Sequence, residues 1–289
     1  MKFGRNYKLL IVNPQNEEIT IEPPFTLHFS VERNNLATAN TGELELTNLG
    51  QSTRNRIYKD RFDDGTKWHL ELWAGYSDNL FKVMSGSIKE ALSYKNGTDW
   101  KTHIQVYDGA DAFKNGFVAA TYSSGTSKTD LVRDVIKTLP NIKTGLLGSY
   151  AQGEGPKRAS VVFGPSREVL HYLVDGHFFV DNETCHVLAD FEYDGTDTLD
   201  LDETQLLQTP QRSDSGLDVS ILFYPQIRVS ISAVLKSIYP IYNGKYIISG
   251  FHHDVLISES ENGKAETRIN LYKMGPNGEA AGSIFKAIT

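Results

Sequence analysis

Cysteine, long apolar runs and excess positive charge are all scarce in this chain of 289 residues. Its single cysteine, Cys185, cannot form an internal disulfide, which fits a reducing compartment or a protein indifferent to redox conditions. No uncharged run approaches the roughly 20 residues that a membrane helix needs. The N-terminal stretch MKFGRNYKLLIVNPQNEE is too polar for the core of a signal peptide. The net charge of −7 argues against a protein that coats nucleic acid with a basic surface.

Motifs that carry catalysis are also missing, since the chain has no G-x-S-x-G, P-loop or H-E-x-x-H. The pair His252-His253, followed by Asp254, is the strongest candidate for a metal or catalytic site. Neighbours on a regular strand point to opposite faces, so the two imidazoles cannot bind one ion together. We expect His253 to be a partly buried core residue, His252 to face outward and Cys185 to be inert core. The sequence therefore predicts no enzyme, and no catalytic, cofactor-binding or metal-binding residue.

What the sequence does contain is a series of short alternating patterns typical of β-strands. Leu27, Phe29 and Val31 share one face of a predicted strand, and Leu44 and Leu46 share one face of the next. Short strands at even spacing favour an antiparallel sandwich or barrel. The 14 tyrosines and 14 phenylalanines suit a β-rich fold.

The middle of the chain changes to a helical period. TSKTDLVRDVIKTLPN predicts a helix with Ser127 as N-cap, and PSREVLHYLVDGHF predicts a second with Ser166 as N-cap. A short helical turn is predicted in GQSTRNRIYKD, with Ser52 as N-cap. HFFVDNETCHVLADF predicts a hairpin that turns at Asp181-Asn182. A small α/β unit is therefore expected between two β regions.

Two distant stretches of the chain resemble each other in order and spacing. Ser85-Gly86 corresponds to Ser249-Gly250 at an offset of 164 residues, and Asn96-Gly97 to Asn262-Gly263 at 166. THIQVY (102–107) corresponds to TRINLY (267–272) at an offset of 165. The pattern predicts two copies of one β unit. The expected division is a first β-barrel domain over residues 1–112, an α/β insertion over 113–190, a second β-barrel domain over 191–275 and a C-terminal tail over 276–289.

A run of acidic residues opens the second β region. It carries seven acids in fourteen residues: Asp190, Glu192, Asp194, Asp197, Asp200, Asp202 and Glu203. Such a run is usually a solvated face. It could also line a channel and repel DNA.

These patterns together resemble the baseplate hub proteins of tailed phages. FTLHFSVERN, TGELELTNLGQSTRNRI and WHLELWAGYSDNLFKVMSGSI resemble the N-terminal half of that family, and SSGTSKTDLVRDVIKTL resembles the helix of its insertion. LLQTPQRSDSGLDVSILFYP and NGKYIISGFHHDVLISESENGKAETRINLY resemble its C-terminal half. The resemblance extends from Asn13 to Lys273.

The resemblance implies a mainly β fold of two tail-tube-like antiparallel β-barrels with a small α/β domain, and a structural role without cofactors. Three chains would form a ring that adapts a hexameric tail tube to a trimeric central spike, because duplication converts threefold into pseudo-sixfold symmetry. The implied partners are further copies of the chain, the tail tube protein and the spike protein, with the tape measure and baseplate wedge proteins as additional neighbours. DNA would pass through the lumen without specific binding during ejection. The implied location is the virion tail baseplate, assembled in the host cytoplasm, with no membrane partner.

An adhesin or carbohydrate-binding β-sandwich of the tail is the competing interpretation. Trp68, Trp73 and Trp100 would then be its stacking platform. All three occupy alternating strand positions, which is more often typical of core residues.

Overall fold

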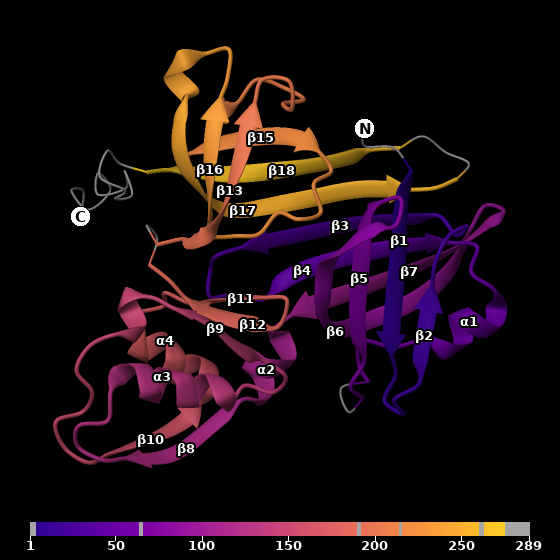
Figure 1. Ribbon diagram of the computed structural model, residues 1–289. Helices are drawn as coiled ribbons and strands as arrows, with labels where there is room; N and C mark the ends of the chain where they lie inside the picture. Colours follow the sequence, from indigo (N-terminus) through magenta and orange to yellow (C-terminus); the bar gives the residue numbers. More distant parts are fainter. Residues whose placement is uncertain (1–3, 64–65, 190–191, 214–215, 260–262, 275–289) are drawn as a thin grey trace.

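The computed structural model describes residues 4–63, 66–189, 192–213, 216–259 and 263–274 (Figure 1). Within them the chain is mainly β-strand, and its longest helix has ten residues. Thirteen of the described strands join into one large sheet, and two smaller sheets of two and three strands belong to the middle of the chain.

The first β region follows the alternation expected from the sequence. Along β3 every second residue is buried, so that Leu27, Phe29 and Val31 enter one core. The polar residues between them stay on the other face of the sheet. The elements of this region are β1 (Arg5–Val12), β2 (Glu18–Ile21), β3 (Leu27–Asn34), β4 (Asn40–Thr47), α1 (Gln51–Arg56), β5 (His69–Tyr76), β6 (Asn79–Asn96) and β7 (Asp99–Asp108).

The middle of the chain has its own hydrophobic core, which includes Cys185 and the apolar stripe of α3. In Figure 1 this α/β insertion lies below the large sheet, with α3 and α4 beside the β8–β10 ribbon. Its elements are α2 (Ala110–Asn115), β8 (Phe117–Tyr122), α3 (Lys128–Lys137), β9 (Lys143–Leu147), a 3₁₀ turn (Ser149–Ala151), β10 (Ser160–Pro165), α4 (Ser166–Leu173), β11 (Phe179–Asp181) and β12 (Thr184–Val187).

The helices predicted from the sequence are present, but only one of the three predicted N-caps is confirmed. Ser127 caps α3 by accepting from the backbone N–H of Asp130, as predicted. Ser166 is instead the first residue of α4, after Pro165, and its buried hydroxyl bonds to Thr138 at 2.6 Å. The Ser52 cap was wrong, because α1 begins at Gln51, after Gly50. Ser52 is therefore the second residue of the helix, which has no side-chain cap. The β11–β12 hairpin is confirmed, but it turns at Asn182-Glu183, one residue later than predicted. Asp181 still pairs with Thr184, and the two turn residues have positive φ values of 48° and 59°.

The second β region forms a third core, centred on β17 and β18. Its acidic strand β13 pairs with β16 in parallel, unlike the antiparallel pairs that surround it. The elements are β13 (Asp194–Asp202), β14 (Gln211–Arg212), β15 (Leu217–Leu222), β16 (Ile231–Lys236), a 3₁₀ turn (Pro240–Tyr242), β17 (Gly244–Ile257) and β18 (Ala265–Lys273).

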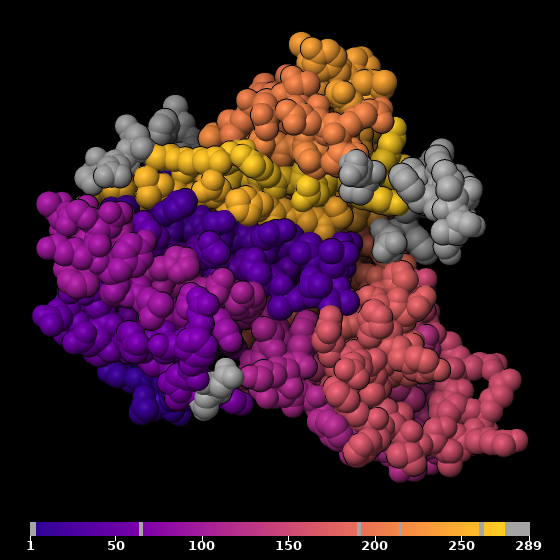
Figure 2. All heavy atoms as spheres, turned by 180° about the vertical axis from the view of Figure 1, so that it is seen from behind, coloured from indigo at the N-terminus to yellow at the C-terminus, as the bar shows by residue number. Residues whose placement is uncertain are grey.

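The two β regions are joined edge to edge, not built as separate barrels. One edge of β17 pairs with β16 over Gly244–Ile247 and then with β3 over Gly250–Ile257. The resulting order is β14-β15-β18-β17-β3-β4-β7-β6-β5-β1-β2. No pairing among the described strands closes either region into a barrel, so the barrel prediction needs correction to one large, mainly antiparallel sheet. Figure 2 shows β17 and β18 as a yellow band across the molecule, between the indigo first region and the orange strands of the second region.

Candidate functional site

The hairpins β6–β7 and β17–β18 have the same pairing scheme. The first strand of each hairpin, β6 or β17, carries a one-residue bulge. The bulge lies opposite the same point of the second strand: between Val106 and Gln105 of β7, and between Leu271 and Asn270 of β18. The neighbouring strands also correspond, since β3-β4-β7-β6-β5-β1 matches β14-β15-β18-β17-β16-β13 in order. The one difference in direction is the last pair, which is antiparallel in the first region and parallel in the second.

A buried threonine occupies the same place in both hairpins. Thr102 and Thr267 are fully buried and lie at the predicted offset of 165 residues. Thr102 exchanges a hydrogen bond of 2.9 Å with Ser93, and Thr267 bonds His253 at 2.9 Å. Ser93 and His253 stand opposite the threonines in the paired strands. The repeat therefore extends from the sequence into side-chain contacts.

The register corrects one part of the predicted repeat. Ser249 is the bulged residue of β17, and the bulged residue of β6 is Lys89, not Ser85. Ser249-Gly250 therefore corresponds to Lys89-Glu90 at an offset of 160 residues, and the similarity to Ser85-Gly86 is a coincidence of composition.

Of the two predicted Asn-Gly turns, the structure describes the first completely and the second only in part. Asn96-Gly97 ends β6, and Gly97 has a positive φ of 63°, which glycine adopts without strain. In the second region Asn262 lies outside the described residues, and Gly263 is half-buried just before β18. The equivalence of the two turns stays a prediction.

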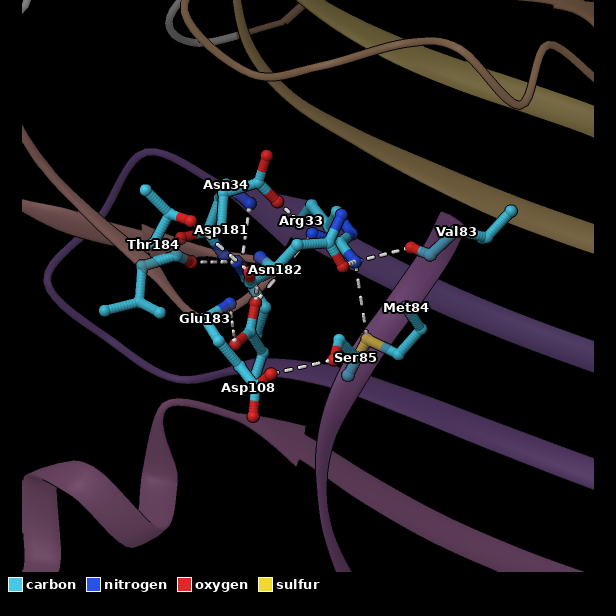
Figure 3. Close-up of polar contacts among 12 residues, drawn as sticks. Arg33, Asn34, Val83, Met84, Ser85, Asp108, Asp181, Asn182, Glu183 and Thr184 are labelled. Carbon is cyan, nitrogen blue, oxygen red and sulfur yellow. Dashed lines mark hydrogen bonds and ion pairs between the residues drawn. The ribbon is translucent and has the colours of Figure 1, made fainter. Parts of the chain in front are cut away.

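Arg33 lies at the point where both β regions and the insertion meet, and Figure 3 shows its partners. Its guanidinium is buried, pairs with Asp181 and donates to the side-chain oxygen of Asn182 at 2.6 Å. Its Nη1 lies 3.8 Å from the carboxylate of Asp108 at the end of β7. It also donates to the backbone carbonyl of Val83 on β6. One side chain thus ties the sheet of the first region to the β11–β12 turn.

Further hydrogen bonds fix the β11–β12 turn on the first region. The Asp108 carboxylate accepts from the backbone N–H groups of Asn182 at 2.6 Å and Glu183 at 3.0 Å. Ser85 donates to the Glu183 carboxylate at 3.0 Å, and Asn40 donates to the carbonyl of Val180 at 2.7 Å. Ser85, expected to mark the repeat, therefore serves to hold the insertion.

Two carboxylates share the single guanidinium of Arg33, and this affects their protonation. Burial raises the pKa of Asp108 to about 7, while Arg33 and the two backbone N–H groups favour its charged form. Asp181 acts in the same direction as burial, because a second negative charge nearby disfavours ionisation of Asp108.

The histidine pair divides between the two faces of the sheet, as predicted. His253 is fully buried, and burial together with the nearby Arg33 guanidinium holds its pKa well below the usual value, so the ring is neutral. His252 lies on the opposite, polar face and bonds the hydroxyl of Ser30 at 2.8 Å. Among the described residues, no group of three His, Cys, Asp or Glu side chains could hold a metal ion.

The acidic run lies mostly on the edge strand β13, and much of its charge is used locally. Asp194 and Asp197 both pair with Arg228, at 3.2 and 3.0 Å. Glu192 accepts from the backbone N–H of Ser149, and Glu203 from that of Ile238. Asp200 and Asp202 are exposed, and Asp190 lies outside the described residues.

The three tryptophans do not behave alike. Trp68 packs against the first core, as expected, whereas Trp73 lies on the opposite face of the sheet with its indole N–H donating to Glu71 at 3.1 Å. Trp100 is partly exposed under the guanidinium of Arg54, 3.9 Å from the ring centroid. Trp68 and Trp73 therefore cannot belong to one stacking platform.

Cys185 is fully buried, and burial raises the pKa of its thiol to about 12. The thiol is therefore protonated near neutral pH, as inert core requires. No helix in the described part of the chain is long and apolar enough to span a membrane.

Solved structures with a similar fold include phage tail proteins and a type VI secretion component. The 43 kDa tail protein of prophage MuSo2 from Shewanella oneidensis matches with a TM-score of 0.61 at 8% identity, covering 94% of this chain and 98% of that one. The tail protein from Neisseria meningitidis MC58 matches with a TM-score of 0.58 at 10% identity, covering 94% and 97%. The c3393 protein of E. coli, a type VI secretion component described as similar to the T4 tail proteins gp27 and gp5, matches with 0.55 at 10%, covering 89% and 76%. The fold is thus that of phage tail proteins.

Family membership is more specific than fold. The family model described as baseplate hub gp41 matches residues 10–261, so this chain belongs to that family. No curated protein matches the sequence. Membership identifies the chain as a structural protein of the phage tail baseplate.

Proposed function

We propose that three copies of this chain form a ring that adapts a hexameric tail tube to a trimeric central spike. The observation that carries the proposal is the repeated hairpin, with the same bulge and the same buried threonine in both β regions. Two similar units in each of three chains present six similar positions around the tail axis. A ring of this kind can contact a sixfold partner on one side and a threefold partner on the other.

The polar face of the joined sheet is the proposed channel lining. Across β15, β18, β17, β3 and β4 the residues opposite the cores are mostly polar, with Leu222 and Leu256 as exceptions, and the same face passes from one region to the other without interruption. This face carries more acids than cations. Its acids are Glu32, Glu43, Glu45, Asp218, Asp254 and Glu266, and the cations that pair with them are Arg268, Lys101 of the neighbouring β7 and Lys264 just before β18. A mainly acidic wall repels the DNA phosphates, so DNA can slide without binding.

The proposed domain division follows the three cores. Residues 1–112 and 191–275 are the two ring-forming units, and 113–190 is the insertion. The predicted C-terminal tail, 276–289, lies outside the described residues. Each of the three cores is composed mainly of residues from one of these ranges. The insertion lies beside the sheet (Figure 1), and we propose it as the contact for wedge proteins, with the tape measure protein on the channel side.

Copy number tests the proposal. Peptide quantification with isotope-labelled standards on purified tails should find this chain equimolar with the spike chain, at half the number of tube chains in one tube ring. Six copies per tail, or a chain that dissociates with the outer fibres when they are removed, would contradict the hub function and favour an adhesin.

A further inference from the structure

An ordered loop with exposed apolar side chains connects β16 to β17. Ile238, Tyr239 and Ile241 are 68%, 52% and 67% exposed. The backbone is nevertheless fixed: Ile238 donates to Glu203 at 2.7 Å, and a 3₁₀ turn follows at Pro240. In Figure 1 this loop forms the top of the molecule, away from the first β region. A fixed apolar loop of this kind indicates a contact surface.

The shared register shows which segment of the first region corresponds to this loop. The pair Ser232–Ile247 in β16–β17 corresponds to His69–Ser87 in β5–β6, so the loop takes the place of the β5–β6 hairpin tip. That tip already contacts the second region across the joint, by which we mean the β3–β17 pairing that connects the two β regions. Tyr76 packs on Phe223 of the second region with ring centroids 6.0 Å apart, and its hydroxyl donates to the Phe223 carbonyl at 3.0 Å.

The surface that receives Tyr76 also has a counterpart. The backbone N–H of Phe223 donates to the carbonyl of Ala265 at 2.9 Å, and in the first region Asn48 donates to Trp100 at 2.8 Å. These residues correspond in the register, because Ala265 stands opposite Val255 as Trp100 stands opposite Lys95. The first region thus has a corner of the same construction, with Trp100 38% exposed.

We infer that the β16–β17 loop docks on the Asn48–Trp100 corner of a second copy of this chain. The inference rests on the proposed ring, in which the joint inside each chain is approximately repeated between chains. Both parts of the contact, loop and corner, belong to this chain, which is why the partner is another copy and not a different tail protein.

The contact between copies differs from the joint inside the chain in one respect. Where the second region supplies Phe223 and Val255 to the joint, the first region has Asn48 and Lys95 at the equivalent positions. The apolar area is therefore smaller, and it consists of Ile238, Ile241 and the Trp100 ring. A smaller contact suits a ring that closes only during tail assembly.

Cross-linking between single-cysteine variants tests the inference, since the natural Cys185 is fully buried and does not react. Tails are assembled with a mixture of Ile241→Cys and Arg54→Cys chains carrying different tags, and are treated with a short bismaleimide. Position 54 is chosen because the Arg54 side chain stacks on Trp100, and replacing Arg54 does not remove the Trp100 ring. Val161→Cys, on the exposed β10, replaces Ile241→Cys in the control.

We expect the Ile241→Cys and Arg54→Cys mixture to yield a cross-linked pair that carries both tags. Tails with either variant alone and tails with the Val161→Cys control should yield none. Three copies per tail without the mixed product would overturn this inference and leave the hub function standing. A copy number other than three would overturn both.

Discussion

The β6–β7 and β17–β18 hairpins share a register but differ at the edge beside them. In the second region the edge of β17 is covered by β3, where Arg33 stands opposite Phe251. In the first region Ala91 of β6 corresponds to Phe251. Lys59 stands opposite Ala91 and pairs with it through an isolated bridge. The first region therefore closes its own edge with a short segment, and the second closes its edge with the other half of the chain.

This difference shows how a duplicated unit becomes asymmetric. Exposed strand edges invite pairing with other chains, and both edges are already covered here, one by β3 and the other by the segment at Lys59. Each covering segment carries a buried cation. Arg33 is 2% exposed and Lys59 7%. Contacts between copies are then left to side chains and loops instead of continuous strand pairing.

The largest expected effect comes from removing the cation of the joint. Arg33→Ala should lower the free energy of unfolding by about 3–5 kcal/mol, because it leaves Asp108 and Asp181 buried without a positive partner. Urea denaturation measures it. Arg133→Ala, at an exposed pair with Asp130, is the matched control and should cost no more than about 0.5 kcal/mol. Equal losses in the two variants would show that the joint does not depend on Arg33.

Two glycines that look equivalent in the sequence should respond differently. A Cβ at Gly86 would lie 2.4 Å from the carbonyl oxygen of Tyr107, and a Cβ at Gly250 would lie 2.9 Å from that of Arg33. Gly86→Ala should therefore cost about 1–3 kcal/mol of overpacking, and more than Gly250→Ala. Thermal unfolding of the two variants compares them. Equal losses would favour the alignment of Ser85-Gly86 with Ser249-Gly250 over the register described above.

The two histidines provide a second comparison. His253→Ala should cost about 1–3 kcal/mol, because the buried Thr267 hydroxyl loses its bond to the imidazole and keeps only the backbone N–H of Tyr224 as a partner. His252→Ala should be nearly neutral. Ser93→Ala, the counterpart in the first region, should cost about 0.5–1.5 kcal/mol through Thr102. Stoichiometric zinc in the native protein, lost in both histidine variants, would overturn the structural interpretation.

Protonation of Asp108 should give the joint a pH dependence. The pKa of Asp108 is raised in the folded state to about 7, so its contribution to stability is fully present below the unfolded pKa of about 3.9 and is lost as pH rises through about 7. The Asp108→Asn variant lacks this loss. The stability of the variant relative to the native chain should therefore rise between pH 5 and pH 8, as followed by urea denaturation at several pH values. Parallel curves would show that Asp108 is ionised throughout this range.

Much of the strand pattern could be predicted, because alternation along a strand is a local property. The same alternation contained an overlooked signal. Arg33 continues the face of Leu27, Phe29 and Val31, and a charge on that face predicts a buried ion pair. Asp108 continues the buried face of β7 in the same way.

The edge-to-edge joint and the position of the bulges could not be read from the sequence. Both depend on which strands pair, and pairing between β3 and β17 connects residues more than 200 positions apart. The repeat was visible in THIQVY and TRINLY because that closing strand keeps its register. It was misplaced at Ser85-Gly86 because β17 corresponds to β6 at an offset of 160 residues, not 165. Five more residues lie between Val255 and Ala265 than between Lys95 and Trp100.

Electron microscopy of assembled tails tests the central claim most directly. In a reconstruction with threefold symmetry, a rotation of about 60° around the tail axis should carry the β6–β7 hairpin onto the β17–β18 hairpin of the same chain, with Glu32 and Glu43 facing the channel. The next such rotation should carry β17–β18 onto β6–β7 of the neighbouring copy. Hairpins related by any other rotation, or a channel lined by the hydrophobic cores or the insertion, would contradict the account.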